Sequence, residues 1–247
     1  MCSQESRIAN LTFCTYNIFG FNQTKIKYVS ELLQSYSILL LQEHWMNNKQ
    51  LSEFGNLFPG YCVHGISAID DTQLLRGRPK GGVLIIYPDS LGSTVKYITS
   101  TSCRLCAMSM QIESFILFIF CLYMPCDIND KENLFEYETL LTEISTICIK
   151  YNGENVYIAG DLNTELSRKG SWHTNALSQF ENMKIYMSLL IILMQMLIIV
   201  TVIILPNHIV LLIILLYLRV YKHLLTNIIV YVTKSKTNPI TPQLYKT

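Results

Sequence analysis

Asn155-Val-Tyr-Ile-Ala-Gly-Asp-Leu-Asn163 is a short apolar run followed by two polar side chains. The β-branched and aromatic residues of its first half predict a buried strand, which we expect to end at Gly160. Side chains two positions apart on an extended segment project to the same side, so Asp161 and Asn163 should leave the strand together. A carboxylate and an amide in that arrangement suit a divalent cation and a phosphate oxygen. The alternative is an Asx-turn, in which both side chains satisfy their own backbone.

The chain has two parts of unlike composition. Residues 1–181 hold all 18 acidic residues and 13 of the 19 Lys and Arg residues, which is a net charge of −5. Residues 182–247 contain no Asp, Glu or Gly and carry six Lys or Arg residues. We therefore divide the chain into a domain over residues 8–184, large enough for a sizeable core, and an apolar, acid-free tail over residues 185–247. The negative charge of the first part argues against a broad nucleic-acid-binding surface, so any such contact must be local.

The eight cysteines are scattered, and several lie inside apolar runs. This distribution indicates reduced, buried thiols in a cytosolic or nuclear protein. Cys103 and Cys106 form a lone C-x-x-C pair, for which packing within a strand is a better account than zinc binding. The polar N-terminus is not followed by a secretory apolar segment, so we expect no signal peptide.

Strands and helices along the first part alternate in a way that favours two packed sheets with helices outside. The periodicity predicts strands over residues 8–17, 37–42, 83–87, 94–99, 105–112, 115–123 and 155–163, and helices over residues 25–35, 51–58 and 134–150.

Four of these strands deliver polar residues at their ends: Asn17, Glu43, Tyr123, and the pair Asp161 and Asn163. Phosphodiester hydrolysis needs a cation that neutralises charge on the transferring phosphoryl group, and Mg²⁺ prefers one or two carboxylates plus water. Glu43 is the first-choice ligand for Mg²⁺, with Mn²⁺ as the alternative ion. The two Asn residues can orient phosphate oxygens, Asp161 can position or activate water, and Tyr123 can donate to a phosphate oxygen. Each has a plain structural alternative as a solvated or turn-capping residue.

His44 follows Glu43 directly and should face the opposite way on a strand. We therefore interpret it as structural or as a residue on the substrate side, and not as the catalytic base.

Four motifs together resemble the endonuclease/exonuclease/phosphatase superfamily: Cys14-Thr-Tyr-Asn17, Leu41-Gln-Glu-His-Trp45, Leu122-Tyr-Met-Pro125 and Ala159-Gly-Asp-Leu-Asn163. The resemblance covers about residues 8–184 and implies a deoxyribonuclease-I-like fold, a four-layered α/β/β/α sandwich. Within the superfamily, the sequences of these motifs and of Gly77-Arg-Pro-Lys-Gly-Gly82 are most similar to those of endonuclease domains of non-LTR (LINE-type) retrotransposons, which nick DNA with Mg²⁺. By this resemblance Glu43 is a metal ligand, and the other polar residues at the strand ends are its active-site partners.

The loop before the strand at residue 83 carries Arg76, Arg78 and Lys80 among glycines. The resemblance implies that these side chains contact the DNA phosphate backbone, with the glycines permitting close approach. Without the resemblance, the plainer interpretation is an ordinary solvated turn that carries three charged side chains.

The tail departs from the family pattern. We expect the last third to supply further strands, an Asp, and a closing Asp-His pair whose His serves as acid/base, and we find none of them in the sequence. Residues 185–218 instead form a run of 34 residues without a formal charge. Ile185–Leu205 is long enough for a membrane span. We favour a frameshift, because a shifted reading of the back-translated codons permits the usual continuation of the family.

These observations leave three functions open. The first is a DNA-nicking endonuclease with little activity, nuclear or cytoplasmic, whose fold is incomplete at the C-terminus. The second is a phosphoesterase of the same superfamily that the tail anchors to a membrane through residues 185–218. The third is a non-enzymatic membrane protein whose first domain binds a partner.

Overall fold

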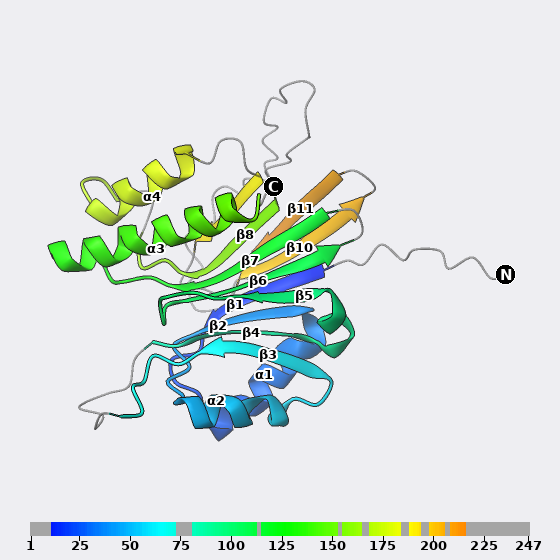
Figure 1. Ribbon diagram of the computed structural model, residues 1–247. Coiled ribbons are helices and arrows are strands. Elements are labelled where there is room, and N and C mark those ends of the chain that lie inside the picture. Colours follow the sequence, from blue (N-terminus) through cyan, green and yellow to red (C-terminus); the bar gives the residue numbers. More distant parts are fainter. Residues whose placement is uncertain are drawn as a thin grey trace.

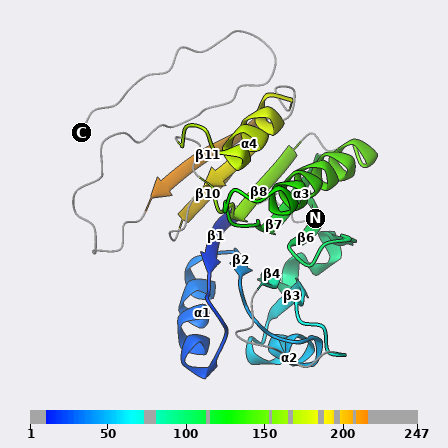
Figure 2. The same cartoon turned by 90° about the vertical axis from the view of Figure 1, so that its left-hand side faces the viewer.

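The computed structural model describes residues 11–72, 81–112, 115–152, 155–164, 168–183, 188–193, 198–205 and 208–215. Two β-sheets face one another between two layers of helices (Figures 1 and 2). Helices α1 (Gln23–Ser35) and α2 (Asn48–Phe54) cover one sheet, and α3 (Lys131–Lys150) and α4 (Trp172–Met183) cover the other. The predicted four-layered sandwich is therefore confirmed.

The first sheet has six strands in the order β11-β10-β1-β2-β4-β3. Their bounds are β1 Leu11–Asn17, β2 Ile38–Gln42, β3 Tyr61–Ile66, β4 Val83–Pro88, β10 Ile198–Leu205 and β11 His208–Leu215. Strands β1 and β2 are parallel and joined through α1, with Asn17 paired to Gln42. Their carboxyl ends therefore meet, and Glu43 emerges beside Asn17.

The second sheet has five strands in the order β5-β6-β7-β8-β9. Their bounds are β5 Val95–Ile98, β6 Leu105–Ile112, β7 Phe115–Tyr123, β8 Asn155–Asp161 and β9 Ser188–Leu193. Strands β7 and β8 are parallel and joined through α3, with Tyr123 paired to Asp161. This register repeats the arrangement of β1 and β2 on the facing sheet.

Alternation along the strands divides the apolar side chains between three cores. On β1, Phe13 packs into the cluster between the two sheets, whereas Cys14 packs into the cluster under α1 and α2. A third cluster lies between the second sheet and α3 and α4. The sheets are thus held rigidly face to face, and the ends of their central strands are fixed relative to one another.

Gly160 does not end its strand as expected, because β8 continues through it to Asp161. Its φ of +144° and its contact with the neighbouring strand explain the glycine: a Cβ there would lie 2.0 Å from the Leu122 carbonyl oxygen. The residue permits a close approach of β8 to β7 immediately before the polar pair.

The expectation that the chain lacks further strands after residue 184 is wrong. Strand β9 joins the second sheet in parallel with β8, and β10 and β11 extend the first sheet antiparallel from β1. Among the described residues there is no helix with the length and apolar character that crossing a bilayer requires. The frameshift remains a hypothesis about the coding sequence.

Strand β3 and helix α4 were not predicted from the sequence. Strand β3 lies at the edge of its sheet, is half-buried throughout, and contains His64 and Gly65, which interrupt its apolar pattern. Helix α4 buries Ala176, Leu177 and Phe180 against the second sheet.

Candidate active site

The carboxamide of Asn17 joins the two sheets at the edge where β1, β2, β7 and β8 end. Its Nδ2 donates to Oε1 of Glu43 at 2.8 Å and to Oδ2 of Asp161 at 2.9 Å. Asn17 and Glu43 come from one sheet and Asp161 comes from the other, 144 residues further along the chain from Asn17. The expected meeting of these three side chains is therefore present in the structure.

The carboxylate of Glu43 also faces aromatic donors. Trp45 Nε1 donates to Oε2 at 3.1 Å, and the hydroxyl of Tyr123 contacts the same carboxylate. Burial, followed by the charge of Glu43 and the hydrogen bond to it, raises the pKa of the Tyr123 phenol, while nearby Arg104 lowers it. Tyr123 therefore stays protonated at neutral pH and can act as a donor.

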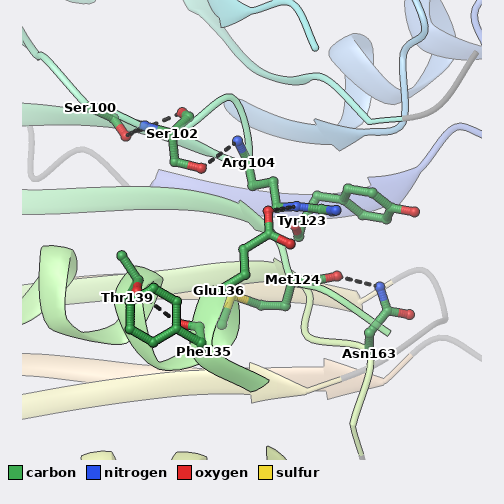
Figure 3. Close-up of polar contacts among 9 residues, drawn as sticks. All are labelled: Ser100, Ser102, Arg104, Tyr123, Met124, Phe135, Glu136, Thr139 and Asn163. Carbon is green, nitrogen blue, oxygen red and sulfur yellow. Dashed lines mark hydrogen bonds and ion pairs between the residues drawn. The ribbon is translucent and has the colours of Figure 1, made fainter. Parts of the chain in front are cut away.

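Asp161 and Asn163 form the Asx-turn that was the alternative interpretation, and they do so within the site. The backbone N–H of Asn163 donates to Oδ1 of Asp161 at 3.1 Å, which leaves Oδ2 for Asn17. The Asn163 side chain donates through Nδ2 to the Met124 carbonyl at 2.7 Å, at the end of β7 (Figure 3). Asn163 has a φ of +48°, so it leaves the extended conformation and its side chain is not parallel to that of Asp161.

Left-handed backbone conformations gather in the loops around these side chains. Phe19, Glu43, Trp45 and Asn163 have φ between +48° and +56°, which is costly for residues other than glycine. The loops are held by backbone hydrogen bonds from Gly20 to the Glu43 carbonyl at 2.7 Å and from Phe21 to the His44 carbonyl at 2.9 Å. Strain concentrated around a few polar side chains is typical of a functional site.

The electrostatics of the site suit a cation. Burial raises the pKa of the Asp161 carboxyl, the charge of Glu43 raises it further, and the hydrogen bonds from Asn17 and Asn163 oppose both effects. The two carboxylates share one neutral amide, and Mg²⁺ is usually bound by one or two carboxylates together with water. No group of three or more His, Cys, Asp or Glu side chains suited to a metal occurs in the described part of the chain. A hard ion that keeps most of its water shell fits this donor set better than zinc.

His44 was interpreted as structural or as a residue on the substrate side, and its surroundings agree with the structural interpretation. It is 1% exposed, its Nε2 lies 3.0 Å from the Ile66 carbonyl, and its Nδ1 accepts from the Met46 N–H at 3.0 Å. Burial lowers its pKa to about 4, so it is neutral at physiological pH.

The predicted DNA contacts Arg76, Arg78 and Lys80 lie outside the described residues. The residues that sequence reasoning missed are Trp45 and Arg104. Arg104 directly precedes β6, and the antiparallel pairing of β6 with β7 places it opposite Tyr123. Pairing the two predicted strands, residues 105–112 and 115–123, as an antiparallel hairpin could have indicated that Arg104 lies next to Tyr123.

The sequence profile of the Endonuclease/Exonuclease/phosphatase family matches residues 14–185, which include all five polar residues of the site. The chain belongs to this family. No curated protein shows significant sequence similarity to it.

Solved structures similar to this family member share its fold at low sequence identity. An AP endonuclease from Leishmania major superposes with a TM-score of 0.54 at 12% identity, over 70% of this chain and 66% of that one. The endonuclease domain of TRAS1, a telomere-specific non-LTR retrotransposon, gives 0.50 at 12% identity, over 71% and 72%. The catalytic domain of APE2 from Xenopus laevis gives 0.50 at 19% identity, over 69% and 67%.

Proposed function

We propose that this family member is a divalent-metal-dependent phosphodiesterase that nicks DNA, and that its activity is low. The observation that carries the proposal is the bridge from Asn17 to both Glu43 and Asp161. It brings two acids and an amide from opposite sheets to one point, where a phosphodiester and a metal ion can be bound together.

The roles follow from the chemistry of each group. Glu43 would hold Mg²⁺ or Mn²⁺, and a bound ion supplies charge neutralisation for the transferring phosphoryl group. Asp161 is suited to accept a proton from the attacking water, because its raised pKa makes it a better base than an exposed carboxylate. Asn17 gives both of its amide N–H groups to Glu43 and Asp161 and so orients the two acids. The second amide N–H of Asn163 and the protonated Tyr123 are suited to donate to phosphate oxygens.

DNA is the proposed substrate for two reasons: residues 76–80 form a basic segment, and the sequences of the motifs resemble those of retrotransposon endonucleases. The membrane-anchored alternatives depended on a helical span over residues 185–205. Strands β9 and β10 occupy most of that segment, so no observation favours those alternatives.

Low activity is proposed because the closing Asp-His pair is missing from the sequence. Among the side chains that the structure describes, three imidazoles occur and none is hydrogen-bonded to the five site residues: His44 bonds to backbone groups, and His64 and His173 stack on tyrosines. The absence of a general acid/base costs roughly 10²–10⁴-fold in rate.

The first test is nicking of supercoiled plasmid with Mg²⁺ or Mn²⁺, an assay that detects one cut per molecule. We expect slow nicking that EDTA abolishes and that is lost in Glu43→Ala and in Asp161→Ala. Glu31→Ala, which changes an exposed acid on α1, is the matched control and should leave the rate unchanged. Nicking that survives both site substitutions would refute the proposed function, whereas rapid nicking lost in both would refute only the low activity.

A further inference from the structure

Arg104 contacts Tyr123 through both its side chain and its backbone. Its guanidinium carbon lies 5.2 Å from the centroid of the Tyr123 ring, and its Nη1 lies 3.4 Å from the Tyr123 carbonyl oxygen. The Tyr123 N–H donates to the Arg104 carbonyl at 2.9 Å. One residue therefore holds the backbone and the ring of the tyrosine whose hydroxyl contacts Glu43.

Helix α3 holds the arginine in turn. Arg104 Nε donates to Oε1 of Glu136 at 2.7 Å, and the Arg104 side chain is only 20% exposed (Figure 3). Glu136 lies in the second turn of α3, which packs on the second sheet. The chain of contacts runs from α3 through Arg104 to Tyr123, which is paired with Asp161 on β8.

A guanidinium that lies over a ring restricts how the ring can tilt, and its charge favours the electron-rich face. Pairing with Glu136 offsets that charge locally, and burial keeps much of the group from solvent. This environment suits an arginine that orients a neighbour better than one that contacts the DNA backbone, for which an exposed and unpaired charge is effective.

We propose that Arg104, held by Glu136, is a positioning residue that fixes the Tyr123 phenol against Glu43 for contact with the phosphate. The inference rests on the proposed function, because the phenol has a catalytic task only if the site cleaves phosphodiesters. The role is indirect: removing Arg104 should weaken catalysis only as far as the Tyr123 hydroxyl contributes to it.

A double-mutant cycle tests this dependence. We expect Arg104→Ala to lower the single-turnover nicking rate about 5- to 20-fold, the effect of losing one stacked and hydrogen-bonded cation. In a Tyr123→Phe background the same change should alter the rate less than about 2-fold, because the hydroxyl is already gone. Arg104→Lys should not restore the rate, since an ammonium cannot stack as a plane or bond Glu136 through Nε. Glu136→Gln should give an intermediate loss.

The salt dependence of DNA binding separates this role from a direct phosphate contact. Arg104→Ala should leave the KM and the salt dependence of binding unchanged, as should Lys96→Ala, a matched loss of an exposed charge on β5. The positioning role would be overturned if Arg104→Ala lowered the nicking rate by the same factor with and without Tyr123→Phe. It would also be overturned if DNA binding by Arg104→Ala depended less steeply on salt. Thermal melts of every variant are needed to check that the fold is retained.

A spectroscopic measurement makes the inference independent of activity. The chain has 15 tyrosines, and in protein labelled with 3-fluorotyrosine the ¹⁹F signal of Tyr123 is the one that Tyr123→Phe removes. This signal should shift or broaden in Arg104→Ala and Glu136→Gln but not in Lys96→Ala. An unmoved signal would overturn the positioning role, whereas absence of nicking by the unsubstituted chain would overturn the proposed function alone.

Discussion

Neutral donors allow the buried Asp161 and the half-buried Glu43 to lie together at the edge of the sandwich. Glu43 is bonded by Asn17 and Trp45 and contacts Tyr123, and Asp161 is bonded by Asn17 and by the backbone of Asn163. Amide, indole and phenol groups satisfy carboxylate oxygens without cancelling their charge. The site therefore keeps a negative field that favours a cation, while its geometry is set by hydrogen bonds that exist without one.

At the same scale, the buried His44 should make stability depend on pH. Its pKa in the folded state is about 4, below the ordinary value of 6.5, so between these values the unfolded chain binds more protons. The stabilisation is fully present above about pH 6.5 and is lost as the pH falls toward 4, at a cost of about 3 kcal/mol. Urea denaturation at pH 7, 5.5 and 4 measures this dependence.

His44→Gln is the control for that prediction. The variant removes the titrating group, so its stability should fall less steeply between pH 6.5 and 4 than that of the unsubstituted chain. Equal slopes for the two proteins would show that His44 does not carry the dependence.

At the scale of elements, helix α1 fixes the loop that follows Asn17. Lys25, near the start of α1, donates through Nζ to the carbonyl oxygens of Ile18, Phe19 and Gly20. A cation near a helix N-terminus opposes the helix dipole, so these carbonyl contacts must account for its position. The helix and the active-site loop thus form one unit.

Lys25→Met should loosen this unit. We expect a loss of about 1–3 kcal/mol in the free energy of unfolding, because charge-assisted hydrogen bonds are removed. Faster amide hydrogen exchange at Phe19–Phe21 should accompany it. Lys27→Met, at a side chain that is 87% exposed and whose Nζ is 3.9 Å from Glu31, should cost less than about 0.5 kcal/mol. Equal losses in the two variants would contradict the role of Lys25.

Strand β8 depends on Gly160 in a comparable way. In Gly160→Ala the added methyl group would meet the Leu122 carbonyl oxygen at 2.0 Å, and backbone cannot move aside as a flexible side chain can. We expect a loss of more than about 4 kcal/mol, seen as loss of the cooperative thermal transition.

Gly60→Ala provides the comparison. Gly60 also has a positive φ, of +86°, but a Cβ there meets nothing within 4 Å. Only backbone strain remains, so the loss should be about 1 kcal/mol. If both variants melt alike, steric contact with β7 is not the reason for Gly160.

At the scale of the whole molecule, the C-terminal strands protect the two strands that carry the site. Strand β10 pairs with β1, which ends at Asn17, and β9 pairs with β8, which ends at Asp161. Without them, β1 and β8 would become edge strands with unpaired backbone groups.

A chain truncated after residue 184 should therefore aggregate or lose cooperative unfolding, although it keeps the four family motifs. Size-exclusion chromatography with light scattering and thermal circular dichroism compare it with the full chain. A monomeric truncated protein with an unchanged melting temperature would show that β9, β10 and β11 contribute little to the fold.

The sequence alone determined the two-sheet class, most strands and helices of the first part, the family, and the polar residues at the strand ends. These features are recorded locally, in periodicities of two and 3.6 residues and in short motifs. Residues 105–112 and 115–123 were predicted with the bounds that the structure has, because they are predominantly apolar segments separated by the polar pair Glu113-Ser114.

Only the tertiary structure decided that one amide of Asn17 bridges Glu43 and Asp161, that the guanidinium of Arg104 lies over the Tyr123 ring, and that strands β9, β10 and β11 follow residue 184. The first two depend on sheet register and on contacts between distant segments, which local pattern does not encode. The third was missed because an uncharged apolar run has the same composition whether it forms buried strands or a helix in a membrane. The two outcomes differ in what pairs with the backbone N–H and C=O groups of the run. In this chain those groups pair with strands at the edge of each sheet.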